Sequence, residues 1–472
     1  MGENVALSVE DIAGSGRLAS DADRTLEAYK MRRHRLLAPL ISASLAITLA
    51  ACAKQDEPSP SPQAAGSFLY GSDGNVQNGF AVAFKEDPGI LSGMKGTAPL
   101  AQLSQDFRTR LAAVDPNLRD LIFAGETYDA AVIAAIATQL AGTTDPKAIA
   151  KQINGVTTGA DKCTRVADCL ALAKAGKDPA YRGATVSNGF TAVGEPSTAS
   201  YGVFHFGPNN QLDNGKTEYL NTGNEKNATT EQPVRPVTGG KSGAPLVLGG
   251  LLPQEGGLAF AYAPMIAGAR LAVREINEAG GVLGQSVVWK DGNDFTDPQK
   301  ALGTVAKHKA DGVHVIIGAG GSGVSVAVLP EVIKGGMVMI SPSNTAAKLS
   351  ELDDSGLYFR TAPSDILQAR ALADVMLRDG ITKICIVARK DAYGEGLMSG
   401  VQKELAGMGL TASVQTFTYD VGENGMIGNE NQVRDVINQI VAAKPEGVLV
   451  IGFEESAAVI KGLNKAGVQF RR

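Results

Sequence analysis

From residue 243 onward, short apolar runs alternate with longer amphipathic segments at regular intervals. Residues 244–252 form one such run, which is typical of a strand buried on both faces. In residues 265–279, apolar positions recur at helical spacing until a pair of glycines follows. The alternation then predicts strands at 286–289, 313–318, 337–341, 383–388, 413–418 and 447–452, and helices at 298–309, 324–334, 365–378, 395–408, 432–443 and 456–466. Apolar strands joined by helices predict an α/β fold with parallel sheets, and a break near residues 358–363 favours two such sheets.

The part of the chain before this series is less regular. Within residues 67–223 the pattern predicts a strand at 68–71, a helix at 128–141 and a late strand at 201–206. Residues 221–242 are polar and rich in Gly, Thr, Asn and Pro, which is typical of a linker. We therefore expect two blocks of secondary structure joined by a linker at residues 224–243.

The N-terminus has the pattern of a bacterial secretory signal. A basic stretch begins at Met31, and residues 36–51 are uncharged, mostly apolar and too short for a comfortable membrane-spanning helix. Residues 1–30 have no such pattern, so Met31 is the better start, and residues 1–52 are interpreted as an extension followed by a signal peptide at 31–52.

The signal ends in Leu-Ala-Ala-Cys at Cys52, which resembles the lipobox of bacterial lipoproteins. This resemblance implies a lipid on Cys52, and the Ser- and Pro-rich residues 53–66 predict a tether between that lipid and a folded body. The expected location is extracytoplasmic, with the chain lipid-anchored to the outer face of the cell membrane. The alternative is a plain signal peptide with an incidental cysteine.

Composition and motifs exclude several functions. A net charge of −5, with 44% apolar and 20% charged residues, is ordinary for a soluble chain and offers no basic stripe for nucleic acid. The four histidines lack metal-ligand spacing, and no G-x-S-x-G elbow is present. Residues 318–323 match G-x-G-x-x-G, but residues 338–343 lack the acid that a dinucleotide ribose requires. We therefore predict no enzyme activity, no cofactor and no metal.

Two cysteines stand close together in a polar segment. Cys163 and Cys169 are six residues apart, and in an exported chain a disulfide between them is expected. Its loop is so small that it would stabilise the fold by only ~2 kcal/mol. Zinc is the rival ligand, but two thiolates without a nearby histidine do not complete a zinc site.

Six motifs resemble those of the branched-chain amino acid binding proteins of ABC transporters, a family of type I periplasmic binding proteins. They lie in the family's order at residues 251–260, 272–281, 317–323, 340–345, 391–396 and 452–455. The resemblance implies two Rossmann-like lobes with parallel sheets (periplasmic binding protein-like I), joined by a hinge of crossing strands. We expect the crossings near residues 358–363, 89–97 and 200–206.

The order of the two blocks departs from that family. The family continues past the helix equivalent to 456–466 into a strand and a Gly-x-Asp/Glu-Gly turn, and here this continuation stands at residues 68–74. The chain is therefore interpreted as circularly permuted. Residues 244–363 would give the first half of lobe 1, residues 364–472 lobe 2, and residues 67–223 the end of lobe 2 with the second half of lobe 1. Two alternatives stay open: an artefact of gene assembly, and complementation of a neighbouring chain by residues 67–223.

The resemblance also implies a ligand site with donors at one end. Ser322, after Gly321 at the expected start of a helix, matches the serine that binds the ligand carboxylate, and backbone N–H groups there suit an anion. Thr345 adds a hydroxyl, Ser343 matches a position that offers backbone polar groups, and Asn344 lies between them. Helix caps and turns are the plain alternative for these residues.

An acid is expected at the other end. Asp73 matches the residue that pairs with the ligand ammonium, and Tyr393 matches an aromatic wall. Phe453 stands where the family often has a tyrosine, so one hydroxyl contact is absent. The plain alternatives are a turn aspartate and a core aromatic.

We therefore expect a monomeric substrate-binding lipoprotein that closes a cleft over a small amino acid of the branched-chain type, or an amide, and docks on ABC permease subunits. A ligand sensor or regulator with the same fold, of the amide-sensing type, is the alternative. A non-binding product of a rearranged gene is another.

Overall fold

The computed structural model describes residues 66–231 and 244–471. The signal peptide, Cys52, residues 53–65 of the tether and residues 232–243 of the linker lie outside the described residues. Within the described part, no helix combines the length and the apolar character that crossing a membrane requires.

The later block builds a five-stranded parallel sheet by itself, and we call this sheet with its covering helices lobe 1. The strand order is β11-β10-β9-β7-β8, and every neighbouring pair is parallel. Its strands are β7 (Val247–Leu251), β8 (Val288–Lys290), β9 (Val315–Gly318), β10 (Val338–Ser341) and β11 (Tyr358–Arg360).

The second sheet, the centre of lobe 2, is shared between the two blocks. Its seven strands run in the order β13-β12-β14-β1-β2-β5-β6, parallel as far as β2 and antiparallel at β5 and β6. The late block supplies β12 (Ile384–Arg389), β13 (Val414–Tyr419) and β14 (Gly447–Ile451). The early block supplies β1 (Phe68–Gly71), β2 (Lys95–Pro99), β5 (Thr198–His205) and β6 (Glu218–Gly223).

Helices cover both faces of each sheet. Lobe 1 carries α2 (Gln105–Ala112), α3 (Ala124–Ala141), α4 (Pro146–Thr158), α5 (Val166–Lys174), α6 (Tyr262–Glu278), α7 (Pro298–Ala310) and α8 (Ser322–Gly335). Lobe 2 carries α9 (Asp365–Arg378), α10 (Ala392–Gly407), α11 (Glu430–Ala443) and α12 (Ser456–Lys465). A small parallel pair, β3 (Asp161–Cys163) with β4 (Pro179–Tyr181), lies beside α5. Short 3₁₀ helices span Asn78–Phe84, Asn214–Lys216, Glu225–Asn227, Ala259–Ala261, Ala347–Ser350, Thr411–Ser413 and Glu423–Gly425.

The alternation of side chains along the strands explains this layering. In β9, Val315 and Ile317 pack against α3 and α6, whereas Ile316 packs against α7 and α8. Successive side chains of a strand point to opposite faces, so a strand that is apolar throughout needs helices on both sides.

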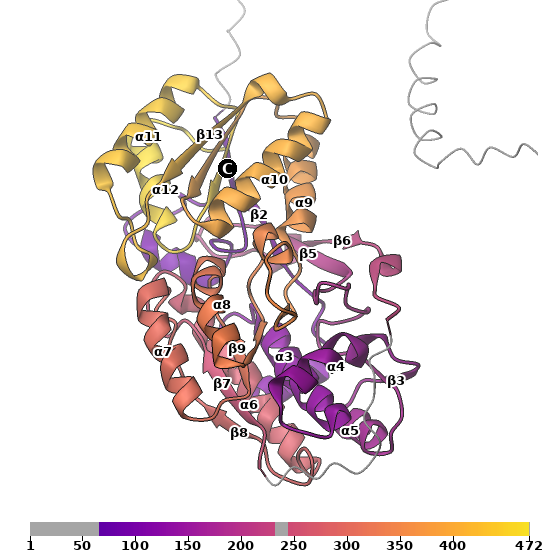
Figure 1. Cartoon of the computed structure of the whole chain (residues 1–472). Helices are drawn as coiled ribbons and strands as arrows, with labels where there is room; N and C mark the ends of the chain where they lie inside the picture. The colour runs from indigo at the N-terminus through magenta and orange to yellow at the C-terminus, as the bar shows by residue number, and fades with distance from the viewer. Residues whose placement is uncertain (1–65, 232–243, 472) are drawn as a thin grey trace, which may run out of the picture. The chain divides into compact units, whose positions relative to one another are not determined.

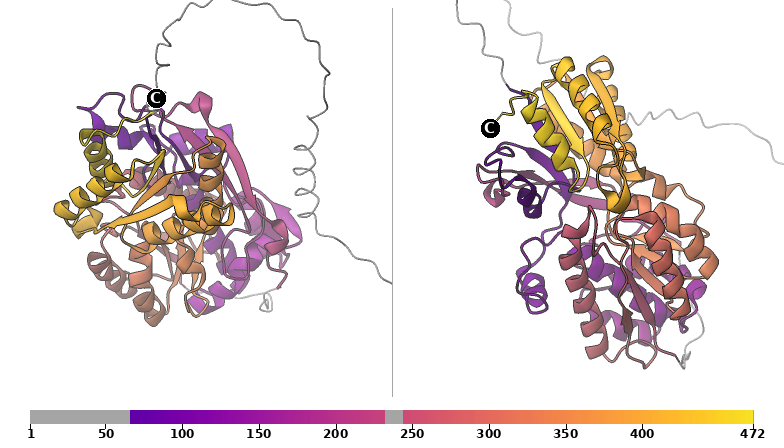
Figure 2. Two further views of the ribbon diagram at one scale, coloured as in Figure 1. Left: turned by 90° about the horizontal axis from the view of Figure 1, so that it is seen from above. Right: turned by 90° about the vertical axis from the view of Figure 1, so that its left-hand side faces the viewer.

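The early block therefore takes part in both lobes. Figure 1 shows its indigo-to-magenta elements in two places, with α3, α4 and α5 beside α6 and with β2, β5 and β6 beside α9. Both views in Figure 2 show the same interleaving of early and late elements. Three segments link the lobes: residues 100–104 after β2, residues 182–197 before β5, and residues 361–364 after β11. The expected crossing at 89–97 is displaced, because β2 still belongs to the lobe 2 sheet and the chain crosses only after it. The expected crossing at 200–206 is displaced too, because these residues lie mostly in β5 of the same sheet and the chain crosses before it.

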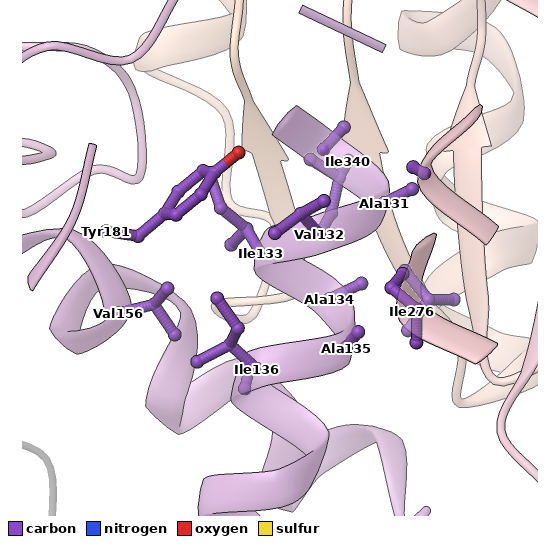
Figure 3. Packing of buried hydrophobic residues seen from close by; sticks show 14 of the residues in the cluster. Ala131, Val132, Ile133, Ala134, Ala135, Ile136, Val156, Tyr181, Ile276 and Ile340 are labelled. Atoms are coloured by element: carbon purple, nitrogen blue, oxygen red, sulfur yellow. The ribbon is translucent and has the colours of Figure 1, made fainter. Parts of the chain in front are cut away.

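Helix α3 is the principal contact of the early block with lobe 1. Figure 3 shows Ala131, Ala134 and Ala135 on the side facing Ile276 of α6, and Ile136 near Val156 of α4. All but one of its 18 residues are buried, which explains why apolar residues occur on every side of this helix.

Two predicted helix starts are too late because side-chain caps begin these helices earlier. Helix α10 begins at Ala392 and not at residue 395, because the Asp391 side chain accepts hydrogen bonds from the N–H groups of Tyr393 and Gly394. Asn429 likewise starts α11 at Glu430. The polar residues 221–223 belong to β6 and not to a linker, since an edge strand with exposed side chains has no apolar pattern.

Candidate ligand-binding site

A narrow cavity lies between the two lobes, beyond the carboxyl ends of their strands, where open α/β sheets bind ligands. It is lined by residues from both blocks of the chain: Asp73, Gly74, Phe123, Leu258, Gly320, Ser322, Ser343, Thr345, Tyr393 and Phe453. Of the eight residues expected from the sequence, six thus surround one cavity. Gly321 lines a larger neighbouring cavity of ≈ 650 Å³, and Asn344 lines neither.

The lobe 1 wall presents the start of α8. Ser322 is the first helical residue, and its hydroxyl accepts a hydrogen bond from the Ala346 N–H at 3.3 Å. The Ser322 hydroxyl proton therefore stays free to donate into the cavity. The first N–H groups of a helix also lack intrahelical acceptors, so this wall suits an anion.

Residues 318–321 form a glycine-rich loop between β9 and α8, and not every N–H group of this loop is available to a ligand. The Gly320 N–H donates to the buried carboxylate of Asp294 at 2.7 Å, and the Ala319 N–H donates to the Ser325 hydroxyl at 3.2 Å. Burial raises the pKa of Asp294 to about 6, and its hydrogen bonds from backbone N–H groups partly oppose that rise. Asp294, which the sequence analysis missed, is thus a positioning residue for this loop.

Three consecutive residues of the loop after β10 have different roles at the site. The Ser343 hydroxyl donates to the Gly320 carbonyl at 2.8 Å, and the Asn344 amide donates to the carbonyls of Ala319 and Gly320, each at 3.0 Å. Both side chains therefore hold the two loops together. Thr345 lines the cavity, and its buried hydroxyl oxygen makes no regular hydrogen bond within the described residues.

The lobe 2 wall presents Asp73, in the turn after β1. One of its carboxylate oxygens accepts hydrogen bonds from the Tyr393 hydroxyl at 2.7 Å and from the Gln368 amide at 3.0 Å. Burial raises the pKa of Asp73 to about 6, although both hydrogen bonds act in the opposite direction. The next residue must be glycine, because a Cβ on Gly74 would lie 2.3 Å from the Gly452 carbonyl oxygen.

Aromatic rings close the cavity on the same side. Tyr393 stacks on Phe453 with ring centroids 5.3 Å apart, and the Arg389 guanidinium lies 3.9 Å from the Phe453 centroid. Arg389 is itself buried and donates to Glu455 at 2.8 Å. Burial alone would lower the pKa of Arg389, but the carboxylates of Glu455 and Asp391 outweigh it and raise that pKa. The buried ion pair between Arg389 and Glu455 thus holds the stack of Tyr393 and Phe453 in place.

The two walls are close together. The enclosed space is ≈ 10 Å³, about enough for one water molecule. Backbone hydrogen bonds join the lobes beside it, from the Gly257 N–H to the Asn424 carbonyl at 2.8 Å and from the Glu454 N–H to the Gly257 carbonyl at 3.2 Å. An amino acid is several times larger than water, so its entry requires the walls to separate.

Sequence reasoning also missed two apolar lining residues, Phe123 and Leu258. Phe123 precedes α3 with a φ of 58°, a left-handed conformation that is rare for a non-glycine residue. No periodic pattern marks such a position.

Outside the cavity, Cys163 and Cys169 form a disulfide that joins β3 to α5, as expected from the sequence.

With this geometry in place, comparison with known proteins identifies the later block. Residues 245–472 match the family described as periplasmic binding protein. This segment supplies Ser322, Ser343, Thr345, Tyr393 and Phe453, whereas Asp73 and Phe123 come from the block before it.

Individual relatives cover a similar share of the chain. The Leu/Ile/Val-binding protein BraC3 of Rhizobium johnstonii is 32% identical over 173 residues, which is 36% of this chain and 47% of the relative. The Leu/Ile/Val-binding protein homolog 3 of Brucella melitensis is 26% identical over 228 residues, 48% of this chain and 60% of the relative. The chain thus spans about half the length of the curated relatives it matches.

Among solved structures, the branched-chain amino acid transporter substrate binding protein LivJ from Streptococcus pneumoniae, in complex with isoleucine, is similar with a TM-score of 0.41. The sequence identity is 19%, and the match covers 48% of this chain and 63% of LivJ.

Proposed function

We propose that the chain is the substrate-binding protein of an ABC importer and captures a small amino acid of the branched-chain type, or an amide, by closing its cleft. One observation carries this proposal: an acid, Asp73, and the hydroxyls of Ser322 and Thr345 line one cavity from opposite lobes. An amino acid carries an ammonium and a carboxylate, so it needs an anion at one end and donors at the other.

Closure would provide the selectivity. A ligand shifts a hinge equilibrium only as far as it binds the closed state more tightly than the open one. Ser322 and Asp73 belong to different lobes, so a ligand that contacts both is bound fully only when the cleft is closed. The Leu/Ile/Val-binding names of the relatives favour a branched aliphatic side chain, and the apolar Phe123, Leu258 and Phe453 suit one.

A thermal-shift screen of the chain from residue 53 tests this function. We expect leucine, isoleucine or valine to raise the melting temperature, with ~2.7 kcal/mol of added stability at a hundredfold excess over Kd. Acetamide and urea serve as amide probes, and glutamate serves as a control with an added negative charge. No shift with any amino acid or amide would contradict the proposal.

We also propose that the chain is a circular permutation of the family order. The Ser67 N–H donates to the Gln469 carbonyl at 2.8 Å, and the Arg471 N–H donates to the Ser67 carbonyl at 3.0 Å, so the two blocks meet in space where the family order would join them. A rejoined chain, 244–472 followed directly by 67–231, is expected to fold cooperatively and to bind the same ligand. A rejoined chain that fails to fold would contradict it.

Anchoring through a lipid on Cys52 is a further part of the proposal, supported by the sequence at residues 49–52. The Cys52→Ser variant is expected to move from the membrane fraction to the soluble fraction of its host. Retention in the membrane fraction would contradict lipidation at this residue.

A further inference from the structure

Several buried polar atoms without a regular hydrogen bond lie beside the cavity. They are the Thr345 hydroxyl oxygen, both carboxylate oxygens of Asp365 and the amide oxygen of Gln368. All three residues are almost completely buried, with Asp365 and Thr345 each 1% exposed and Gln368 fully enclosed. A buried polar atom without a partner loses its hydration and gains nothing in return, so such a group calls for an explanation.

The chain brings these groups together through the start of α9. The Asp365 N–H donates to the Thr345 carbonyl at 2.6 Å, which holds the two residues side by side. Gln368 follows one turn later, and its amide N–H group donates to Asp73 and to the Thr97 carbonyl, each at 3.0 Å. Thr345 and Asp73 line the cavity, and Asp365 and Gln368 are each hydrogen-bonded to one of these two lining residues.

The surroundings leave Asp365 without a cation of its own. The groups that face its carboxyl are Asp73, Asp391, Arg360 and the phenols of Tyr201 and Tyr393. Of these, Arg360 is positive, but its guanidinium already pairs with Glu195 and donates to the carbonyls of Asn344 and Ala346. Burial, and next the charge of Asp73, raise the pKa of Asp365 well above its usual value, although the neighbouring Thr345 hydroxyl and the charge of Arg360 act in the opposite direction.

Two neighbouring carboxyl groups in a buried site do not both ionise unless a cation compensates them. We propose that Asp365 is a second charge-setting residue of the ligand site: in the empty chain it shares a proton with Asp73, and a cationic head group of the ligand replaces that proton. In this exchange one positive ligand enters the site, and one proton leaves for the solvent.

This inference rests on the proposed function and narrows its ligand class. A primary ammonium brings a positive charge and N–H donors, which suit the carboxylate of Asp365 and the amide oxygen of Gln368. Amides and urea bring N–H donors without charge and would leave the shared proton in place. The site therefore takes amino acids with a free ammonium group and not amides.

The first test needs no ligand. Urea unfolding of the ligand-free chain is followed between about pH 5 and 8 for the wild type, Asp365→Asn and Asp365→Ser. A carboxyl whose folded-state pKa is raised stabilises the fold at low pH and loses that contribution as pH rises through this pKa. The wild type is thus expected to lose stability on going from pH 5 to 8, and both variants to lose less. At pH 8 their unfolding constants should lie at least about tenfold below that of the wild type. Asp374→Asn, an exposed residue on the same helix, is the matched control and should follow the wild type.

The second test counts protons during binding. Titration calorimetry with L-leucine near pH 6, in phosphate and in imidazole buffer, gives the protons released from the difference in heat. We expect about one proton per leucine for the wild type and less than half as many for Asp365→Asn.

The outcomes separate the two proposals. An unchanged pH dependence of unfolding in both Asp365 variants would overturn the shared proton, whatever the ligand. Leucine binding without proton release would overturn the exchange while leaving the proposed function intact. If acetamide or urea binds and no amino acid does, capture of an amide stands and the cationic ligand class is wrong.

Discussion

The two blocks of the chain build the same two lobes in different ways. Residues 244–471 form all of the lobe 1 sheet and three adjacent strands of lobe 2, with a regular alternation that is visible in the sequence. Residues 66–231 insert β1 and β2 beside β14 and cover lobe 1 with α3, and their sequence has little regularity. The later block therefore carries the recognisable fold, and the early block completes it and adds the acid of the site. The predictions below test how strongly the later block depends on the early one.

The largest expected effect comes from the core of α3. Ile136 is fully buried, and Ile136→Ala is expected to destabilise the whole chain by ~2–5 kcal/mol, because it removes buried methyl groups and leaves a cavity. Val82→Ala, at a site 53% exposed, is the control and should cost far less. Urea unfolding followed by circular dichroism measures both. A loss confined to a minor early transition would show that the later block folds without α3.

A pair of glycines tests the contact between α3 and α6. Both Gly268 on α6 and Gly303 on α7 lie within helices, where alanine normally stabilises by ~1 kcal/mol. A Cβ on Gly268 would lie 2.2 Å from the Ala124 carbonyl oxygen, whereas a Cβ on Gly303 meets nothing within 4 Å.

Gly268→Ala is therefore expected to destabilise by about 1–3 kcal/mol, and Gly303→Ala to stabilise. Chemical denaturation gives both values. The same sign for the two variants would mean that the early and late helices do not approach as closely as described.

The pH dependence of stability tests whether the carboxyl of Glu126 in α3 is buried. Burial raises the pKa of Glu126 to about 8, so the folded chain holds this proton where the unfolded chain has lost it. Its contribution to stability is complete below about pH 4.5 and is lost as pH rises through 8, by about 1.4 kcal/mol per unit of pKa shift. Glu126→Gln should remove that loss in unfolding curves taken between pH 5 and 9. A variant with the same slope as the wild type would place the Glu126 carboxyl in contact with water.

The smallest effect is expected at the contact between α7 and the lobe 2 loop that contains Asn424. The Lys300 ammonium donates to the Asn424 side chain at 2.6 Å in an exposed position. Such contacts contribute little, so Lys300→Ala is expected to weaken leucine binding by less than about threefold in calorimetry, and Lys309→Ala should leave it unchanged. A larger loss would make this contact a main determinant of closure.

The regular block shows how far the sequence alone leads. Buried strands such as β9 and β12 are apolar throughout, so their places and the division into two sheets could be predicted from residues 244–471. Edge strands and side-chain caps escaped prediction, because β6 is polar and the caps at Asp391 and Asn429 depend on single side chains. Motifs brought six lining residues together, but Asp365 and Gln368 gave no sign of their place, since a polar pair at a helix start is ordinary. Only the fold shows that their polar atoms are buried and unpaired.

The most direct test of the central claim is leucine binding by the wild type and by Asp73→Asn. This substitution keeps the acceptor for Tyr393 and Gln368 and removes only the charge. The account predicts that calorimetry finds binding to the wild type, about a hundredfold or more weaker binding to the variant, and no loss of ligand-free stability at pH 7. Equal affinity of the two proteins for leucine would contradict the claim that the early block supplies the acid of a shared site.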